Sequence, residues 1–131
     1  MSAYLKVIGS GDAPLQGPYT EPFAEFPPNR PPDSLSKGDF LVLYAAGWKR
    51  IFAVARVLRR APRGPDPKWP HRLDISYIYN VPPAEGVPVN DISDERELTR
   101  SVRQQTCISL RDAEFKRAWD MLKTKEAELM G

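Results

Sequence analysis

The chain has 131 residues, a net charge of +2 and 41% hydrophobic residues. This length predicts a single domain, residues 1–131, and the apolar content is sufficient for a core without covalent cross-links. The single cysteine, Cys107, excludes an intramolecular disulfide and a cysteine-rich zinc site. No apolar run approaches the roughly 18 residues of a membrane span, and residues 1–10 lack a signal-peptide pattern. We therefore expect a cytoplasmic protein, likewise without a membrane partner.

The first part of the chain predicts one strand followed by a long irregular segment. Residues 4–8 have the apolar content of a strand. Residues 10–34 contain seven prolines, which rule out a long regular element because each removes a donor and fixes φ. Three aromatic residues, Tyr19, Phe23 and Phe26, are too many for a free linker. We expect an ordered loop folded over the rest of the domain.

Residues 40–44 and 50–57 form two apolar runs joined by a short glycine-containing connection, which predicts a β-hairpin. Both runs are apolar on both faces, so both faces of the sheet must be covered. In a chain of this size, the pattern favours a barrel or curled sheet with helices packed outside.

Four further elements follow the hairpin. The alternating pattern of residues 71–81 predicts a half-buried strand. A short helix is expected over residues 93–102, and a short last strand over residues 104–108. Residues 109–112 resemble a capping box, and an apolar stripe then predicts a C-terminal helix over residues 110–129. The members of that stripe are Phe115, Ala118, Trp119, Leu122 and Leu129.

No combination of residues in the sequence is typical of a catalytic, metal or cofactor site. His71 is the only histidine, and it has no motif around it. Cys107 lies in a predicted strand, where a buried inert thiol is more common than a nucleophile. Gly9-Ser10-Gly11 lacks the lysine and the spacing of a phosphate-binding loop. An enzyme is therefore the weaker hypothesis, with no cofactor and no metal expected.

The segment from residue 49 to residue 72 is the candidate for nucleic-acid contact. It contains eight basic residues, and its one acidic residue is Asp66. Such a segment attracts phosphates, although a solvated strand end and loop explain it equally well. Within it, Trp69 is held between Pro67 and Pro70. A rigid indole of this kind stacks on nucleobases, for roughly 1–3 kcal/mol per base, or else closes the end of a barrel.

Several short motifs in order resemble a known family. They are Ile8-Gly9-Ser10 at the end of the first strand, Lys37-Gly38-Asp39 before the hairpin, the strand of residues 50–57, Asp66-Pro67-Lys68-Trp69-Pro70, and Arg103-Gln104 before Ile108-Ser109-Leu110. In this order and spacing they resemble the EVE domain of the PUA-like superfamily, which is related to the YTH and ASCH domains. The resemblance extends from about Tyr4 to Leu122. It implies an α+β fold: a PUA-like β-pseudobarrel of about five to six strands with helices packed outside.

The resemblance also implies a pocket for one nucleobase, often a modified base flipped out of DNA or RNA and gripped by aromatic side chains. Trp69 matches one aromatic wall and Ser10 a position that lines the pocket. The second tryptophan of relatives is missing, so Tyr19, Phe23 or Phe26 would replace it. Asn29 and Gln104 have the right chemistry to bind a base edge. Arg59, Arg60, Arg63 and Lys68 would hold the flanking phosphates.

The sequence therefore predicts a monomeric nucleic-acid-binding module that reads a modified base, with a partner nuclease or helicase left open. Burial of a methyl group, and a cation–π term where the base is charged, would favour the modified form. Two alternatives remain. One is a binder of a small heterocyclic metabolite that uses the same pocket. The other is a protein-interaction module that uses the Pro-rich loops.

Overall fold

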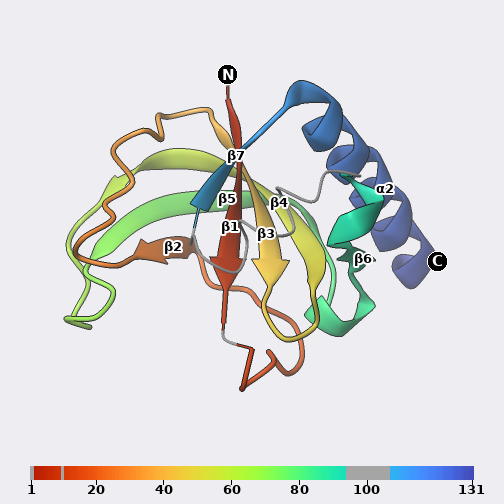
Figure 1. Cartoon of the computed structure of the whole chain (residues 1–131), viewed down its shortest axis with the longest axis horizontal. Helices are drawn as coiled ribbons and strands as arrows, with labels where there is room; N and C mark the ends of the chain where they lie inside the picture. The colour runs from red at the N-terminus through yellow and green to blue at the C-terminus, as the bar shows by residue number, and fades with distance from the viewer. Residues whose placement is uncertain (1, 10, 94–106) are drawn as a thin grey trace.

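The computed structural model describes residues 2–9, 11–93 and 107–131. These residues form an α+β fold, in which a curled mixed sheet carries a C-terminal helix on one side (Figure 1). The helix predicted for residues 93–102 lies almost entirely outside the described residues. No helix in the described ranges is long and apolar enough to cross a membrane.

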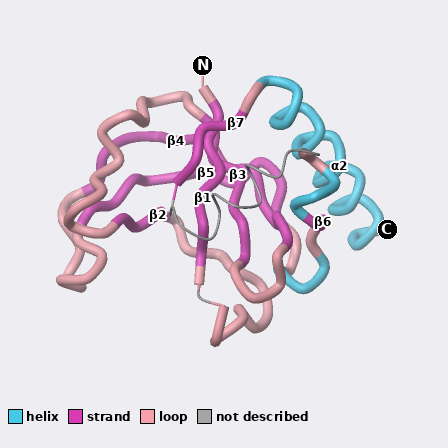
Figure 2. Tube along the Cα trace, in the orientation of Figure 1, coloured by secondary structure: helices cyan, strands magenta, loops and turns pink. Residues whose placement is uncertain are grey.

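The sheet has seven strands, against the five to six predicted, and Figure 2 shows their path. Six of them lie in the order β2-β5-β4-β3-β1-β7, and the two-residue β6 pairs with β4. Their bounds are β1 Ala3–Ile8, β2 Phe23–Phe26, β3 Phe40–Ala45, β4 Arg50–Ala61, β5 His71–Asn80, β6 Val87–Pro88 and β7 Cys107–Leu110. Two short 3-10 helices, η1 (Pro83–Glu85) and η2 (Val89–Asp91), flank β6.

The predicted hairpin is confirmed as the antiparallel pair β3 and β4. The chain turns at Gly47 and Lys49, which have φ angles of 89° and 57°. Glycine suits the first of these because it adopts positive φ without steric cost. β1 lies parallel to β3 on the other side, with Leu5 opposite Val42, so the first strand is placed inside the sheet.

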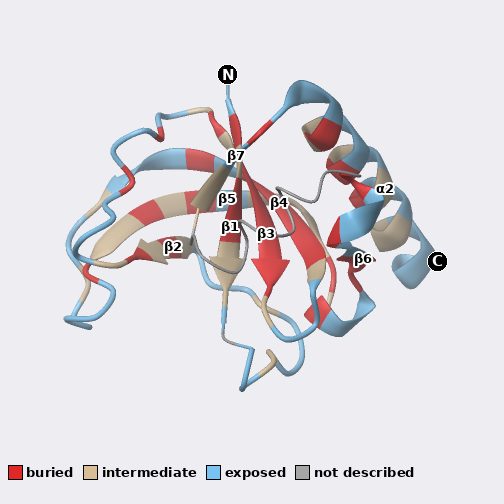
Figure 3. Ribbon diagram, viewed as in Figure 1, coloured by how far each residue is buried: buried red, intermediate tan, exposed pale blue. Residues whose placement is uncertain are grey.

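The core lies on both faces of the central strands, as their two-sided apolar pattern predicts. Residues 41–45 and 51–55 are all buried, and Figure 3 shows this band along β3 and β4. α2 (Asp112–Met130) covers one face. There the Trp119 ring meets Tyr79 and Phe40 edge-on, with centroid separations of 5.1 and 5.9 Å.

α2 begins two residues later than predicted and has a different N-cap. Arg111 is the N-cap, and Glu114 accepts its backbone N–H at 2.9 Å. The predicted assignment of the box to residues 109–112 was wrong because Ser109 and Leu110 still pair with β1. The apolar stripe is confirmed except at its end, where Leu129 is 46% exposed.

The Pro-rich segment contains a short strand that the sequence analysis did not predict. β2 (Phe23–Phe26) pairs antiparallel with β5, so Ala24 lies opposite Leu73 and Phe26 opposite His71. The four residues fit between Pro22 and Pro27, which bound the strand without interrupting its ladder. β2 forms one edge of the sheet path, and β7 forms the other.

Candidate functional site

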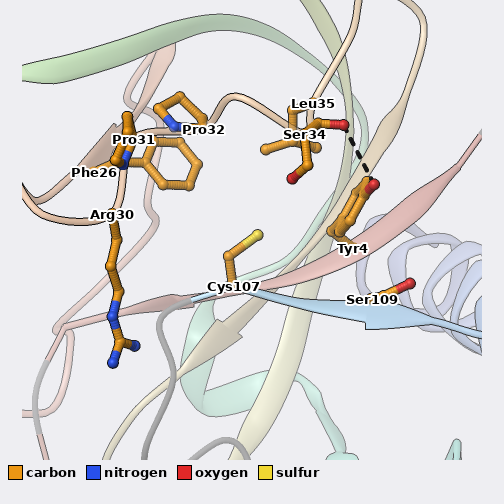
Figure 4. Close-up of a pocket in the computed structure, with 9 residues that line it drawn as sticks. All are labelled: Tyr4, Phe26, Arg30, Pro31, Pro32, Ser34, Leu35, Cys107 and Ser109. Carbon is orange, nitrogen blue, oxygen red and sulfur yellow. Dashed lines mark hydrogen bonds between the residues drawn. The ribbon is translucent and has the colours of Figure 1, made fainter.

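A pocket lies between the two edges of the curled sheet. Phe26 of β2 lines one side of it, and Cys107 of β7 lines the other (Figure 4). These strands are at opposite ends of the strand order, so only the curl of the sheet brings them together. We call this space the seam pocket. Its lining residues are Tyr4, Phe26, Arg30, Pro31, Pro32, Ser34, Leu35, Cys107 and Ser109.

The seam pocket combines apolar walls with a few polar groups. Its volume is about 310 Å³, near the lower end for small-molecule sites. The Tyr4 hydroxyl lies 3.3 Å from the Ser34 carbonyl oxygen, to which it donates. Figure 4 shows the Cys107 thiol directed into the space between Phe26 and Tyr4, and the Arg30 guanidinium at one end. A flat, partly polar molecule is the kind of ligand that such a lining suits.

Lys6 continues the same face of β1 beyond Tyr4, because alternate residues of a strand share a face. It lies directly opposite Cys107 in the β1–β7 pairing. Although it is a lysine, it is only 2% exposed. Its Nζ lies 4.9 Å from the centre of the Phe26 ring and 5.5 Å from the centre of the Trp69 ring. It also donates to the Val7 carbonyl oxygen at 3.0 Å.

Burial controls the electrostatics around Lys6. Loss of water around the ammonium lowers the pKa of Lys6 to about 8, and the nearby Cys107 and Glu25 oppose this only in part. Burial also raises the pKa of the Cys107 thiol to about 11, with Lys6 acting in the opposite direction. At neutral pH the pair is therefore an ammonium beside a protonated thiol, and Cys107 has little nucleophilic character.

Trp69 belongs to an ordered loop between β4 and β5. The Asp66 side chain accepts a hydrogen bond from the backbone N–H of Lys68 at 2.9 Å. The Asp66 backbone carbonyl accepts one from the backbone N–H of Trp69 at 3.1 Å. The Gly64 N–H donates to the Pro70 carbonyl at 2.9 Å, which closes the base of the loop. Trp69 remains 36% exposed. The backbone of this loop is thus fixed, and the Trp69 ring lies near the Lys6 ammonium while part of it stays exposed.

The structure separates the three aromatic residues predicted to face Trp69. Phe26 shares the Lys6 ammonium with Trp69. Phe23 lies on the opposite face of β2, because the two residues are three positions apart, and its ring stacks under the Arg72 guanidinium at 3.9 Å. The Tyr19 ring packs edge-on against Phe52 at 5.8 Å, and the Tyr19 carbonyl accepts the Asn80 side-chain amide.

None of the other three residues predicted to bind a base is placed in the seam pocket by the described part of the chain. Ser10 and Gln104 lie outside the described residues. Asn29 is exposed, in a turn closed by the Arg30 N–H and the Pro27 carbonyl oxygen. Its neighbour Arg30, rather than Asn29, lines the seam pocket.

The four predicted phosphate ligands are exposed, but they do not share one face. Arg59 lies opposite Asp74 on β5 and pairs with it at 2.8 Å. Arg60 lies on the other face of β4 and pairs with Asp33 of the Pro-rich segment at 3.1 Å. Arg63 and Lys68 are exposed in the same loop as Trp69.

Four residues of this region were not predicted as site residues: Lys6, Tyr4, Arg30 and Ser109. For two of them a signal existed. Lys6 is a lone charge inside an apolar strand, and the two-residue period places it beside Tyr4. For Arg30 and Ser109 the position depends on the curl of the sheet, which no local pattern reveals. Across the described ranges, no cluster of three or more His, Cys, Asp or Glu side chains is placed to hold a metal ion.

Comparisons with known proteins support the fold alone. No family model matches the chain, and no curated protein matches it. The chain resembles the solution structure of Rpa0253 from Rhodopseudomonas palustris, with a TM-score of 0.56, 16% identity and coverage of 95% of this chain and 94% of that one. It also resembles a hypothetical protein from Leishmania major, with a TM-score of 0.53, 12% identity and coverage of 98% and 97%.

Proposed function

We propose that this chain is a nucleic-acid-binding module with a PUA-like pseudobarrel, and that it takes a single flipped nucleobase into the seam pocket. One observation carries the proposal. Two aromatic rings from distant parts of the chain, Phe26 and Trp69, border one polar group beside a pocket with both apolar and hydrogen-bonding walls.

The pocket chemistry suits a base that has left its stack. A flipped base loses its stacking energy and must recover it against apolar or aromatic surface. The Phe26 ring, Leu35 and the prolines supply such surface within the pocket. The base edges then need a small number of donors and acceptors, and Tyr4, Arg30 and Ser109 provide hydroxyl and guanidinium groups.

Exposed basic groups in the Trp69 loop and beside the pocket wall support a nucleic-acid ligand. Arg63 and Lys68 are in the loop that holds Trp69, and both are exposed. Arg60 pairs with Asp33 at the start of the chain segment that contains Ser34 and Leu35 of the pocket wall. Phosphates next to a flipped base would meet these side chains. Phosphate contacts position a nucleic acid without reading its sequence, so DNA and RNA are both candidates.

A binder of a small heterocyclic metabolite is the second candidate, and the ion pairs favour it. Arg59 and Arg60 lie on opposite faces of β4, and each is paired with a carboxylate. A backbone that follows the sheet cannot use both arginines on one track. A free heterocycle needs only the pocket.

Binding of labelled single-stranded oligonucleotides that differ in one central base tests the proposal. Fluorescence anisotropy at several salt concentrations gives both the affinity and its salt slope. The proposed function requires that one central base binds more tightly than the others and that affinity falls with salt by about 0.7 slope units per phosphate contact. Binding of free nucleosides without any oligonucleotide binding would favour the metabolite alternative.

A further inference from the structure

We propose that the Lys6 ammonium is the donor that sets the specificity of the seam pocket, so that the pocket selects a heterocycle with exposed oxygen acceptors and rejects one with a fixed positive charge. This inference deepens the proposed function and rests on it for the class of ligand. It reverses one expectation from the sequence, in which a cationic modified base gains a cation–π term in the aromatic pocket.

The Phe26 and Trp69 rings, which would bind a cationic base, already contact the Lys6 ammonium. The Lys6 Nζ is within 5.5 Å of the centres of both the Phe26 and the Trp69 ring. A ring face attracts a cation through its negative quadrupole, and distances up to about 6 Å count as contact. A second positive charge entering beside Lys6 meets like-charge repulsion, which is strong in a site with little water.

The ammonium also has hydrogen-bonding capacity to spare. A lysine carries three donors. Within the described part of the chain, the Val7 carbonyl oxygen is the acceptor found for them, and no carboxylate forms an ion pair with Lys6. Glu25, the carboxylate that acts to raise the pKa of Lys6, is itself paired with Arg72 at 3.4 Å. A ligand oxygen would therefore supply an acceptor that the protein does not.

The position of Lys6 allows such a contact. Tyr4 and Cys107 line the seam pocket, and Lys6 lies two residues along from Tyr4 and directly opposite Cys107. Phe26 belongs to both the pocket lining and the Lys6 contact. Lys6 is not itself part of the pocket lining, so the proposal requires a ligand that reaches past Phe26 and Cys107 toward the ammonium. Oxo groups of a pyrimidine or purine, or a carboxylate substituent, have the chemistry to receive it.

The probes are one oligonucleotide sequence with uracil, 5-carboxylcytosine or 3-methylcytosine at its centre, together with the three free nucleosides. Uracil offers two oxo acceptors, 5-carboxylcytosine adds an anion, and 3-methylcytosine is a cation at neutral pH. The wild-type protein is expected to bind the first two at least about tenfold more tightly than the third, since a hydrogen bond to a charged group outweighs a neutral one. Lys6→Met keeps the length of the side chain and its apolar stem but removes the ammonium, and it is expected to remove most of this preference.

The wild-type protein gives a second measurement that needs no variant. From about pH 6.5 to about pH 8.5 the ammonium, with its pKa lowered to about 8, loses much of its charge. The affinity for the uracil probe should fall several-fold over this range. 3-Methylcytosine does not enter this comparison, because it loses part of its own charge over the same range. Cys107, whose pKa is raised to about 11, stays protonated there, and the Glu25 side chain is paired with Arg72.

Three outcomes are distinct. Base-dependent binding whose preference survives Lys6→Met, with a uracil affinity that the rise in pH leaves unchanged, overturns the role of Lys6 and leaves the proposed function standing. Preferential binding of the acceptor-rich free nucleosides, lost in Lys6→Met, with no oligonucleotide binding, supports Lys6 and overturns the nucleic-acid function. A protein that binds none of the six probes, or that binds the cationic base best, overturns the inference.

Discussion

The ε-ammonium of Lys6 lies 4.9 Å from the centre of the Phe26 ring, although β1 and β2 are not neighbours in the sheet. This contact crosses the interior of the curled sheet near its two edges. It joins the element that the sequence identified first, the strand of residues 4–8, to the strand that it did not predict. The same contact places an ammonium where burial disfavours its charged form, so it links the stability of the fold to the chemistry of the pocket.

Replacement of Lys6 by methionine should stabilise the protein at pH 7. Burial lowers the pKa of Lys6 from 10.5 to about 8, so the charged form is disfavoured in the folded state. Below about pH 8 the Lys6 side chain is protonated in both the folded and the unfolded protein. Burial of the charged ammonium then lowers the free energy of unfolding by up to about 3 kcal/mol. As pH rises to about 10.5, the unfolded state binds more protons and the free energy of unfolding of the wild type rises. The advantage of Lys6→Met should therefore shrink between about pH 8 and about pH 10.

Urea unfolding of both proteins across this pH range measures the effect. The wild-type curve alone is not sufficient, because the raised pKa of Cys107 lowers stability as pH rises above about 9. The difference between the two proteins largely removes that contribution. Lys116→Met is the matched control for replacement of a lysine by methionine, because Lys116 is an exposed lysine on α2. A constant difference at all pH values would contradict the buried ammonium.

The sequence revealed the central sheet because its signals there are local. Strands apolar on both faces at residues 40–44 and 50–57 predicted a covered, curled sheet, and the helix stripe at Ala118 and Leu122 predicted its cover. β2 was not predicted, because four residues between prolines are too few to show the alternating apolar pattern of a strand. Its partner is β5, about fifty residues away, and pairing at that distance leaves no local pattern.

Site residues could be predicted only where a single short segment of sequence contained the whole motif. Trp69 between two prolines was identified as a fixed ring, and the structure places it against Lys6. The choice among Tyr19, Phe23 and Phe26 stayed open because nothing in the sequence showed which face of which element each would occupy. Once Phe23 and Phe26 are known to share a strand, their spacing of three puts them on opposite faces.

Alanine at Arg60 and Arg63 should weaken oligonucleotide binding equally for every central base. The salt slope should also fall, by about 0.7 units for each lost contact to a single strand. Arg59→Ala should have a smaller effect, because Arg59 is on the other face of β4 and paired with Asp74. Lys116→Ala on α2 is the control for loss of an exposed, ion-paired cation. A loss confined to one base, with an unchanged salt slope, would show that these arginines read the base instead.

Glu114→Ala should destabilise the fold by about 1–2 kcal/mol. Burial alone would raise the pKa of Glu114, but hydrogen bonds from the Arg111 backbone, from Ser93 and from the Arg111 side chain outweigh it and lower the pKa. This carboxylate stabilises the fold above its unfolded pKa, and the contribution is lost as pH falls through the folded pKa. Thermal unfolding at about pH 7 and about pH 3 should show a smaller difference between wild type and variant at the lower pH. Glu114→Gln, which keeps an acceptor, should lie between the two proteins.

Trp69→Ala should weaken binding of the preferred oligonucleotide by about 1–3 kcal/mol while the fold is retained. The side chain is 36% exposed, and the backbone of its loop is fixed by Asp66 and Gly64 rather than by the indole. Removal of the ring also frees one side of the Lys6 ammonium, so the pKa of Lys6 should rise toward its ordinary value as water enters. Trp48→Ala is a well-matched control, because Trp48 is also 36% exposed but lies at the β3–β4 turn, where its indole donates to the Leu15 carbonyl. Affinity titration of both variants, with circular dichroism to check folding, separates the roles. An unchanged affinity in a folded Trp69→Ala would remove this ring from the site, and an unfolded variant would show that Trp69 closes the end of the sheet.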